Sequence, residues 1–145
     1  MTTGRPGFDQ FNLVVADMAA TVGFNRLLGL EIPDSLPEWQ DHHRSASLGD
    51  GVDLDFDSVE FARHWNCGWP GGAGGRTGVL GFRLASRDEV DATYVRMTSA
   101  GYIGQQPPYD AFWGARYAII EDPDGNAVGL MSPADPARRR PPELP

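Results

Sequence analysis

One order of expected elements occurs twice along the chain, and this repeat constrains the fold more than any other feature. The first copy begins with the apolar run QFNLVVAD, whose Asp17 suits the N-cap of a helix starting at Met18. An extended LEIP segment and the hairpin HHRSASLGDGVDLDF follow. Residues 79–130 repeat this order as VLGFRLAS, a helix opened by the capping box SRDE, extended YIGQQ and the hairpin RYAIIEDPDGNAVGL. An offset of about seventy residues is too long for a solenoid, so we expect an α+β fold of two tandem βαβββ modules.

The two closing hairpins align residue by residue when Arg44 is matched to Arg116, with two additional residues in the second turn. This alignment gives Asp55 and Gly129 equivalent positions in the two modules. Because side chains alternate between the faces of a strand, Gly129 leaves a hole on one face. Glycine inside a strand often marks a place that something approaches closely. We therefore expect Gly129 to leave volume for a guest molecule.

Length and composition predict one domain, since the chain has 145 residues of which 41% are hydrophobic and 22% charged. Within the crossover between the modules, Asp57 and Glu60 are expected to cap a short helix that carries Phe61 and Trp65. The GWPGGAGG stretch that follows is expected to be a flexible linker. The expected parts are a domain over residues 1–133, with module 1 at about 8–57, a crossover at 58–77 and module 2 at about 78–132, and a disordered tail at 134–145.

The charge of the chain restricts its partners. A net charge of −8 disfavours nucleic acid and anionic membranes, which are bound through clustered cationic side chains. All twelve basic residues are arginine, and the absence of lysine excludes Schiff-base and P-loop chemistry. A single cysteine, Cys67, agrees with a reducing compartment, and no apolar run is long enough to cross a bilayer. We expect a cytoplasmic protein that binds neither nucleic acid nor membrane.

Two stretches, LVVADMAATVGFNRLLGLEI and WGARYAIIEDPDGNAVGL, resemble the vicinal oxygen chelate superfamily. This superfamily includes glyoxalase I, extradiol dioxygenases and bleomycin-resistance proteins, and the resemblance covers about residues 8–132. It implies that each module curls its mixed sheet into half of a cup. It also implies that the metal-dependent members place one metal ligand at each of four equivalent strand positions.

In this sequence the four positions implied by the resemblance fall on Gln10, Val79, Asp55 and Gly129. Gln10 and Asp55 are compatible with a metal, whereas Val79 and Gly129 carry no donor atom. Two protein ligands are fewer than the roughly three that catalytic sites supply. We therefore expect no metal and no other cofactor. The resemblance is then closest to the bleomycin-resistance branch, in which a metal-free homodimer binds a bulky antibiotic in a cleft.

Polar side chains are expected to line the cup. In VDLDFD, Asp55 is the candidate inward acid, able to accept hydrogen bonds from a ligand. Asn12, and Arg83 as its expected counterpart in the second module, either contact the ligand or pair with a neighbouring carboxylate. His42 and His43 are adjacent and face opposite sides of their strand, which leaves one of them for the cup.

The four tryptophans fall in loops or at element edges. Each either covers the edge of the core or stacks on a ligand, and Trp113 is the first candidate for stacking, followed by Trp65. The residues expected to bind the ligand are Gln10, Asn12, Trp39, His43, Asp55, Trp65, Trp69, Arg83, Tyr109, Trp113 and Gly129.

These features favour a metal-free homodimeric protein that sequesters a bulky aromatic natural product or antibiotic, giving self-resistance. No catalytic residue is assigned. The alternative is an enzyme, either a glyoxalase-like lyase or isomerase with an atypical metal, or a metal-free tailoring enzyme that uses Asp55 as a base. Fold alone does not choose between them.

Overall fold

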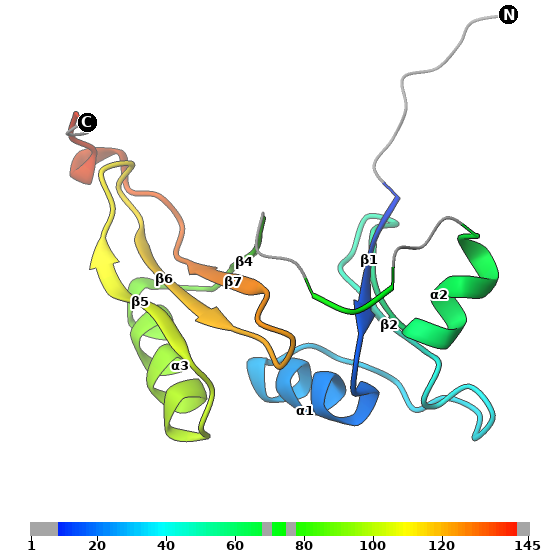
Figure 1. Cartoon of the computed structure of the whole chain (residues 1–145). Helices are drawn as coiled ribbons and strands as arrows, with labels where there is room; N and C mark the ends of the chain where they lie inside the picture. The colour runs from blue at the N-terminus through cyan, green and yellow to red at the C-terminus, as the bar shows by residue number, and fades with distance from the viewer. Residues whose placement is uncertain (1–8, 68–70, 75–77, 142–145) are drawn as a thin grey trace, which may run out of the picture. The chain divides into compact units, whose positions relative to one another are not determined.

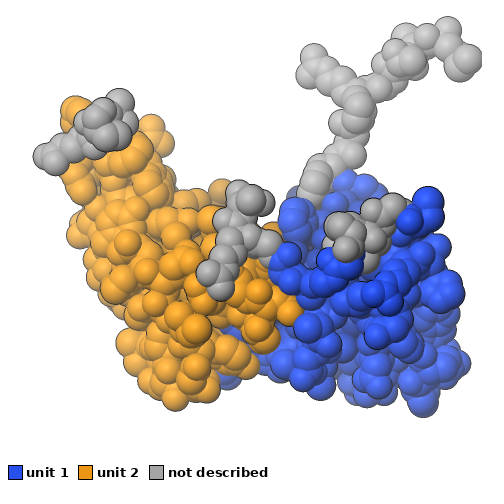
Figure 2. Space-filling model, in the orientation of Figure 1, with its two compact units in different colours: residues 1–74 blue, residues 75–145 orange. Residues whose placement is uncertain are grey.

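The structure, a computed structural model, describes residues 9–67, 71–74 and 78–141. The chain divides into two compact units, residues 1–74 and residues 75–145 (Figure 2). The division falls inside the glycine-rich crossover. Trp69, an expected ligand-binding residue, lies outside the described residues. No helix among the described residues has the length and apolarity that crossing a membrane requires.

Unit 1 contains one three-stranded sheet and two helices (Figure 1). Strand β3 lies in the middle, parallel to β1 and antiparallel to β2. The elements are β1 (Gln10–Val15), α1 (Met18–Leu28), β2 (His43–Ser47), β3 (Asp53–Ser58) and α2 (Val59–Trp65).

The core of unit 1 forms where α1 contacts β3. Asp17 caps α1 as expected, because its carboxylate accepts the backbone N–H of Ala20 at 3.0 Å. The helix ends at Gly29, whose φ of 116° is a left-handed conformation that glycine adopts without steric cost. Phe24 and Phe56 are fully buried. Because side chains alternate along β3, one set faces this core and the other set faces the opposite side of the sheet.

Unit 2 contains a four-stranded sheet in the order β4-β7-β6-β5, with β4 parallel to β7 and the other pairs antiparallel. Helix α3 contacts β5, β6 and β7, and its Val90 and Met97 are fully buried. Ser86 accepts the backbone N–H of Glu89 at 3.2 Å, as its capping box predicts. The elements are β4 (Val79–Arg83), α3 (Arg87–Ser99), β5 (Gly104–Asp110), β6 (Arg116–Glu121), β7 (Ala127–Met131) and the 3-10 turn η1 (Pro136–Arg138).

The expected α+β fold of two modules is confirmed, but the first sheet has three strands where four were expected. The missing strand would be the segment around Ile32 and Pro33. Two guanidinium groups donate hydrogen bonds to the backbone carbonyls of this segment. Arg26 Nε donates to the carbonyl of Ile32 at 3.2 Å, and Arg44 Nη2 donates to the carbonyl of Pro33 at 2.7 Å. Proline also lacks the N–H that a ladder needs. The segment is therefore held by side chains instead of a neighbouring strand.

The register of the closing hairpins differs from the expected alignment. Arg44 pairs with Phe56, and Ala118 pairs with Leu130. Both turns have the same length, residues 48–52 and 122–126, so the second turn carries no additional residues and Arg44 corresponds to Ala118, not to Arg116. The shared arginine does not fix the register, because strand pairing is set by turn length and by which face is buried. The expected equivalence of Asp55 and Gly129 is unaffected, since β1 and β4 pair with them in the same way.

Two further expectations need correction. The N-cap of α2 is Ser58, whose Oγ accepts the N–H of Phe61 at 3.1 Å, and not Asp57. The tail is also structured as far as residue 141. Asp135 caps η1, its N–H donates to the carbonyl of Gly114 at 3.0 Å, and the N–H of Arg140 donates to Phe112 at 2.9 Å. The composition of this segment predicts disorder because composition contains no information about these hydrogen bonds to the preceding loop.

Candidate functional site

The side of the unit 1 sheet that faces away from its apolar core is almost entirely polar. The register places Asn12, Asp55 and Ser45 side by side across β1, β3 and β2. One step along the same face, Asp57 lies beside His43. Because neighbouring strands stay in phase, these side chains converge on one patch.

Asp57 is the centre of this patch, and its side chain is only 1% exposed. Asn12 Nδ2 donates to Asp57 Oδ2 at 2.8 Å, and His43 Nδ1 lies 2.5 Å from Asp57 Oδ1. Both carboxylate oxygens are therefore engaged. Of the two roles left open for Asn12, pairing with a neighbouring carboxylate is the one the structure contains.

Asp55 is the second carboxylate of the patch and is 7% exposed. Ser45 Oγ donates to Asp55 Oδ1 at 2.6 Å. This contact orients the carboxylate and leaves its second oxygen as an acceptor.

A cavity of about 380 Å³ opens over the polar patch. The sheet contributes Gln10 and the Asn12, His43, Asp55 and Asp57 group, while α2 contributes Phe61 and Trp65. The Phe61 and His43 rings meet edge to face at 5.8 Å between centroids. Trp65 is 47% exposed, so much of its ring is available to a bound molecule. We call this the polar cavity.

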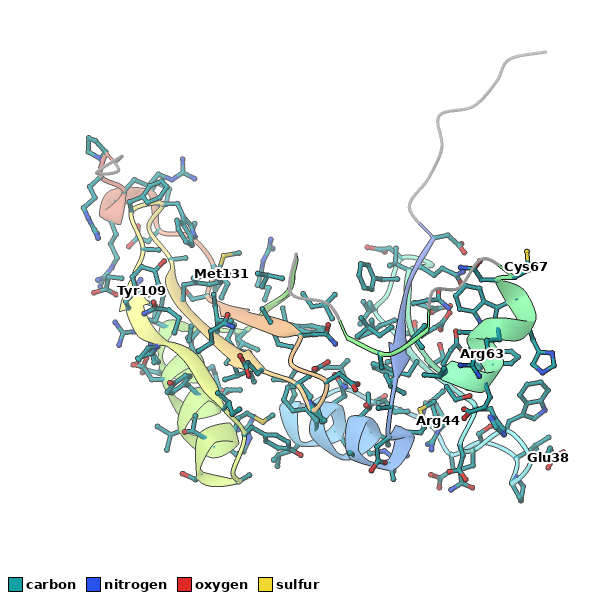
Figure 3. The ribbon with its side chains drawn as sticks, viewed as in Figure 1. Glu38, Arg44, Arg63, Cys67, Tyr109 and Met131 are labelled. Carbon is teal, nitrogen blue, oxygen red and sulfur yellow. The ribbon has the colours of Figure 1, made fainter. Side chains whose placement is uncertain are left out.

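A second cavity of about 470 Å³ lies on the other flank of Phe61. Its walls are mainly apolar and include Trp39, whose ring meets Phe61 edge to face at 5.5 Å. Glu38 and Glu60 also line it, and Glu38 is labelled in Figure 3. Trp39 is thus placed beside the polar cavity and not within it.

In unit 2 the equivalent face has an aromatic side chain, Tyr117, packed against Gly129. A Cβ atom added to Gly129 would lie 3.0 Å from Tyr117 Oη and 3.2 Å from Val79 Cγ1. The Tyr117 phenol therefore occupies the space that Gly129 leaves open on this face. Burial, together with the neighbouring Tyr109, raises the pKa of the Tyr117 phenol. The phenol consequently stays neutral above the pH at which a free tyrosine ionises.

The remaining expected residues of unit 2 belong to the same aromatic cluster or to its edge. Tyr117 lies 6.1 Å from Tyr109 and 5.4 Å from Trp113, centroid to centroid, in edge-to-face contacts. Figure 3 labels Tyr109 and also Met131 of β7. Arg83 is exposed at the end of β4 and pairs with Met131. It is not the counterpart of Asn12, because that register position is taken by Gly81.

The sequence matches a model of the Glyoxalase/Bleomycin resistance protein/Dioxygenase superfamily over residues 7–130, which is most of the chain. The chain belongs to this superfamily. No curated protein matches the sequence.

Solved structures share the superfamily fold. A glyoxalase/bleomycin resistance protein/dioxygenase from Nocardioides is 25% identical, with 99% of this chain and 93% of that chain covered and a TM-score of 0.70. Lactoylglutathione lyase from Agrobacterium tumefaciens is 22% identical, with 90% and 96% covered and a TM-score of 0.67. TioX from Micromonospora sp. ML1 is 19% identical, with 88% and 98% covered and a TM-score of 0.67. The likenesses below 25% identity establish the fold alone.

The residues at the expected metal positions of the superfamily do not fit a metal ion. Val79 is apolar and half exposed, and the space at Gly129 holds Tyr117. Asp55 is engaged by Ser45, and Gln10 supplies only an amide. Across the described parts of the chain, no three His, Cys, Asp or Glu side chains cluster in a way that could hold a metal.

Five of the expected ligand-binding residues line the polar cavity. Gln10, Asn12, His43, Asp55 and Trp65 lie together in unit 1. Asp57, Ser45 and Phe61 were not among the expected ligand-binding residues. The alternation of VDLDFD does place Asp57 on the face of Asp55, but the same residue also suits the N-cap of α2, which is the role that the sequence predicts for it. Trp113, Tyr109, Arg83 and Gly129 lie in unit 2, and their role in binding stays a prediction.

The close contact at Gly129 yields a stability prediction. Gly129→Ala should lower the free energy of unfolding by about 1 kcal/mol, because the new methyl group overpacks against Tyr117. In a Tyr117→Phe background the cost should shrink, since the nearest atom, Oη, is gone. Urea denaturation of the double-mutant cycle measures the coupling. Gly81→Ala is the matched control, because a Cβ at Gly81 meets nothing within 4 Å. Equal effects at the two glycines would contradict the packing.

Proposed function

We propose that the protein binds a bulky, flat aromatic natural product or antibiotic in the polar cavity and sequesters it unchanged. The observation that carries this proposal is the composition of the cavity: α2 contributes an exposed aromatic ring, Trp65, and the sheet contributes carboxylates and amides. Ligand sites are typically concave, mostly apolar and supplied with a few placed polar groups. The proposal needs neither metal nor cofactor.

The stacking surface of the proposed site comes from Trp65. Its indole is attached to the last turn of α2 and is 47% exposed, so a flat ligand can cover it at little conformational cost. Phe61 closes the same side of the cavity but is itself fixed by edge-to-face contacts with Trp39 and His43. The Trp65 ring is therefore free to stack on a ligand, and the Phe61 ring limits how deeply the ligand enters the cavity.

The electrostatics of the site favour a neutral or cationic ligand. Asp55 and Asp57 lie on the cavity wall, and the chain carries a net charge of −8. An anionic ligand would be repelled by both carboxylates. A ligand with hydroxyl or amino groups would satisfy the free oxygen of Asp55.

A second candidate function is an enzyme, favoured by one observation. His43 is held by a buried carboxylate through Nδ1 at 2.5 Å, which is how proteins orient a histidine that acts as a general base. A lyase, an isomerase or a tailoring enzyme could use such a group. The two functions differ in whether the ligand leaves unchanged.

We also propose a homodimer. Strands β1 and β4 are edges of their sheets, and each carries an exposed apolar side chain, Phe11 at 43% and Val79 at 50%. Unpaired edges with apolar side chains favour association with another copy.

The test is titration of a panel of aromatic antibiotics, followed through tryptophan fluorescence, with the ligand then recovered and analysed by mass spectrometry. We expect saturable quenching by at least one member and recovery of that member with unchanged mass. Recovery of a chemically altered compound would support the enzyme instead. No quenching by any flat aromatic compound would contradict the proposed stacking site.

A further inference from the structure

The Asn12–Asp57–His43 chain of contacts fixes which nitrogen of His43 carries a proton. A carboxylate can only accept hydrogen bonds, and a neutral imidazole has one N–H and one lone pair. Since Nδ1 lies 2.5 Å from Asp57 Oδ1, the hydrogen of the neutral ring belongs on Nδ1. Asn12 occupies the other oxygen of Asp57 and so keeps the carboxylate in place.

The lone pair of His43 is therefore left on Nε2. The side chain lines the polar cavity and is 39% exposed. In the described parts of the chain, Nε2 has no hydrogen-bond partner, because the contacts of His43 are Asp57 through Nδ1 and Phe61 through the ring. The imidazole presents an acceptor in a cavity that an aromatic molecule can enter.

Two of the side-chain donors beside this wall are already paired with carboxylates. The side-chain N–H of Asn12 that reaches Asp57 is already used, and the hydroxyl of Ser45 is used by Asp55. The free oxygen of Asp55 adds a second acceptor. A ligand that brings only acceptors and excludes water from the cavity would leave both of these acceptors unpaired, which costs more than the loss of one neutral hydrogen bond.

We propose that His43 is a specificity-determining residue, whose Nε2 selects aromatic ligands that carry a hydrogen-bond donor, as a phenol does. Asp57 and Asn12 act through His43 as positioning residues. The ligand class rests on the proposed binding function, whereas the tautomer of His43 does not.

The first experiment measures the tautomer without a ligand. Long-range ¹H–¹⁵N NMR correlations of the three histidines distinguish Nδ1–H from Nε2–H rings. The His43→Phe variant identifies the signals of residue 43. We expect the neutral His43 ring to carry its hydrogen on Nδ1. A ring protonated on Nε2 would overturn the inference while leaving the proposed binding function intact.

The second experiment compares 2-naphthol with 2-methoxynaphthalene, two flat probes of which only the first has an O–H donor. The wild-type protein should bind 2-naphthol about tenfold more tightly. In His43→Phe both probes should still bind, but the preference should disappear. His64→Phe is the matched control, since His64 lines the second cavity only, and it should keep the preference.

The outcomes separate the two proposals. Equal binding of the two probes by the wild-type protein would overturn the role of His43 but not the stacking site. A preference for 2-naphthol that survives in His43→Phe would also overturn it. If neither probe binds, the proposed function and the ligand class both fail.

Discussion

Asp57→Ala is expected to lower the free energy of unfolding by about 3 kcal/mol. The carboxylate is 1% exposed and accepts from two side chains, Asn12 and His43. Hydrogen bonds to a charged group contribute about 1.5–3 kcal/mol each, and removal of the acceptor leaves the partly buried amide of Asn12 without its partner. The half-exposed His43 can be rehydrated, so the total stays below the sum of the two contacts.

Urea denaturation followed by circular dichroism measures this loss. Asp53→Ala is the matched control, because Asp53 lies on the same strand and face, is partly exposed and has no side-chain hydrogen bond in the described structure. Its effect should stay within about 0.5 kcal/mol. Similar losses from the two variants would show that Asp57 is not the anchor of the polar patch.

Trp65→Ala is expected to weaken the binding of a flat aromatic ligand by about tenfold to a hundredfold. An aromatic stacking contact contributes about 1–3 kcal/mol. The indole is 47% exposed, so its removal should leave the fold intact and act on the ligand alone.

Trp65→Phe tests whether the ring face itself is responsible. It keeps an aromatic surface of smaller area and should lose only part of the affinity. Isothermal titration with the tightest member of the antibiotic panel supplies the dissociation constants. Unchanged affinity in Trp65→Ala would show that the indole on α2 does not contact the ligand. The same titration of Trp113→Ala tests whether the aromatic cluster of unit 2 contributes to binding.

The fold was predictable because its signals are local. Asp17 and Ser86 cap their helices where the sequence places caps, and alternation along β3 separates core from site. The absent fourth strand of unit 1 was not predictable in this way. Its carbonyls are taken by Arg26 and Arg44, and Arg44 is distant from them in sequence.

The site was predictable only in part, because side-chain pairing depends on register. Ser58 and Asp57 are both good N-cap residues, and the choice between them depends on the face of β3 to which each side chain points. The side chain of Asp57 lies on the polar face of the sheet, beside His43, and so becomes part of the polar patch. The occupant of the hole at Gly129 was missed for a similar reason. Tyr117 pairs with Met131 and reaches Gly129 diagonally, a contact invisible to an alignment that matched the hairpins out of register.

Native mass spectrometry of the protein purified from its own host tests the central claim most directly, because one spectrum reports bound molecule, metal and oligomeric state. We expect a dimer of the 15.8 kDa chain that carries an aromatic organic molecule and no stoichiometric metal. The molecule released by denaturation should rebind to the wild-type protein and bind Trp65→Ala more weakly. One equivalent of a divalent metal per chain, with catalytic turnover that a chelator abolishes, would contradict the account.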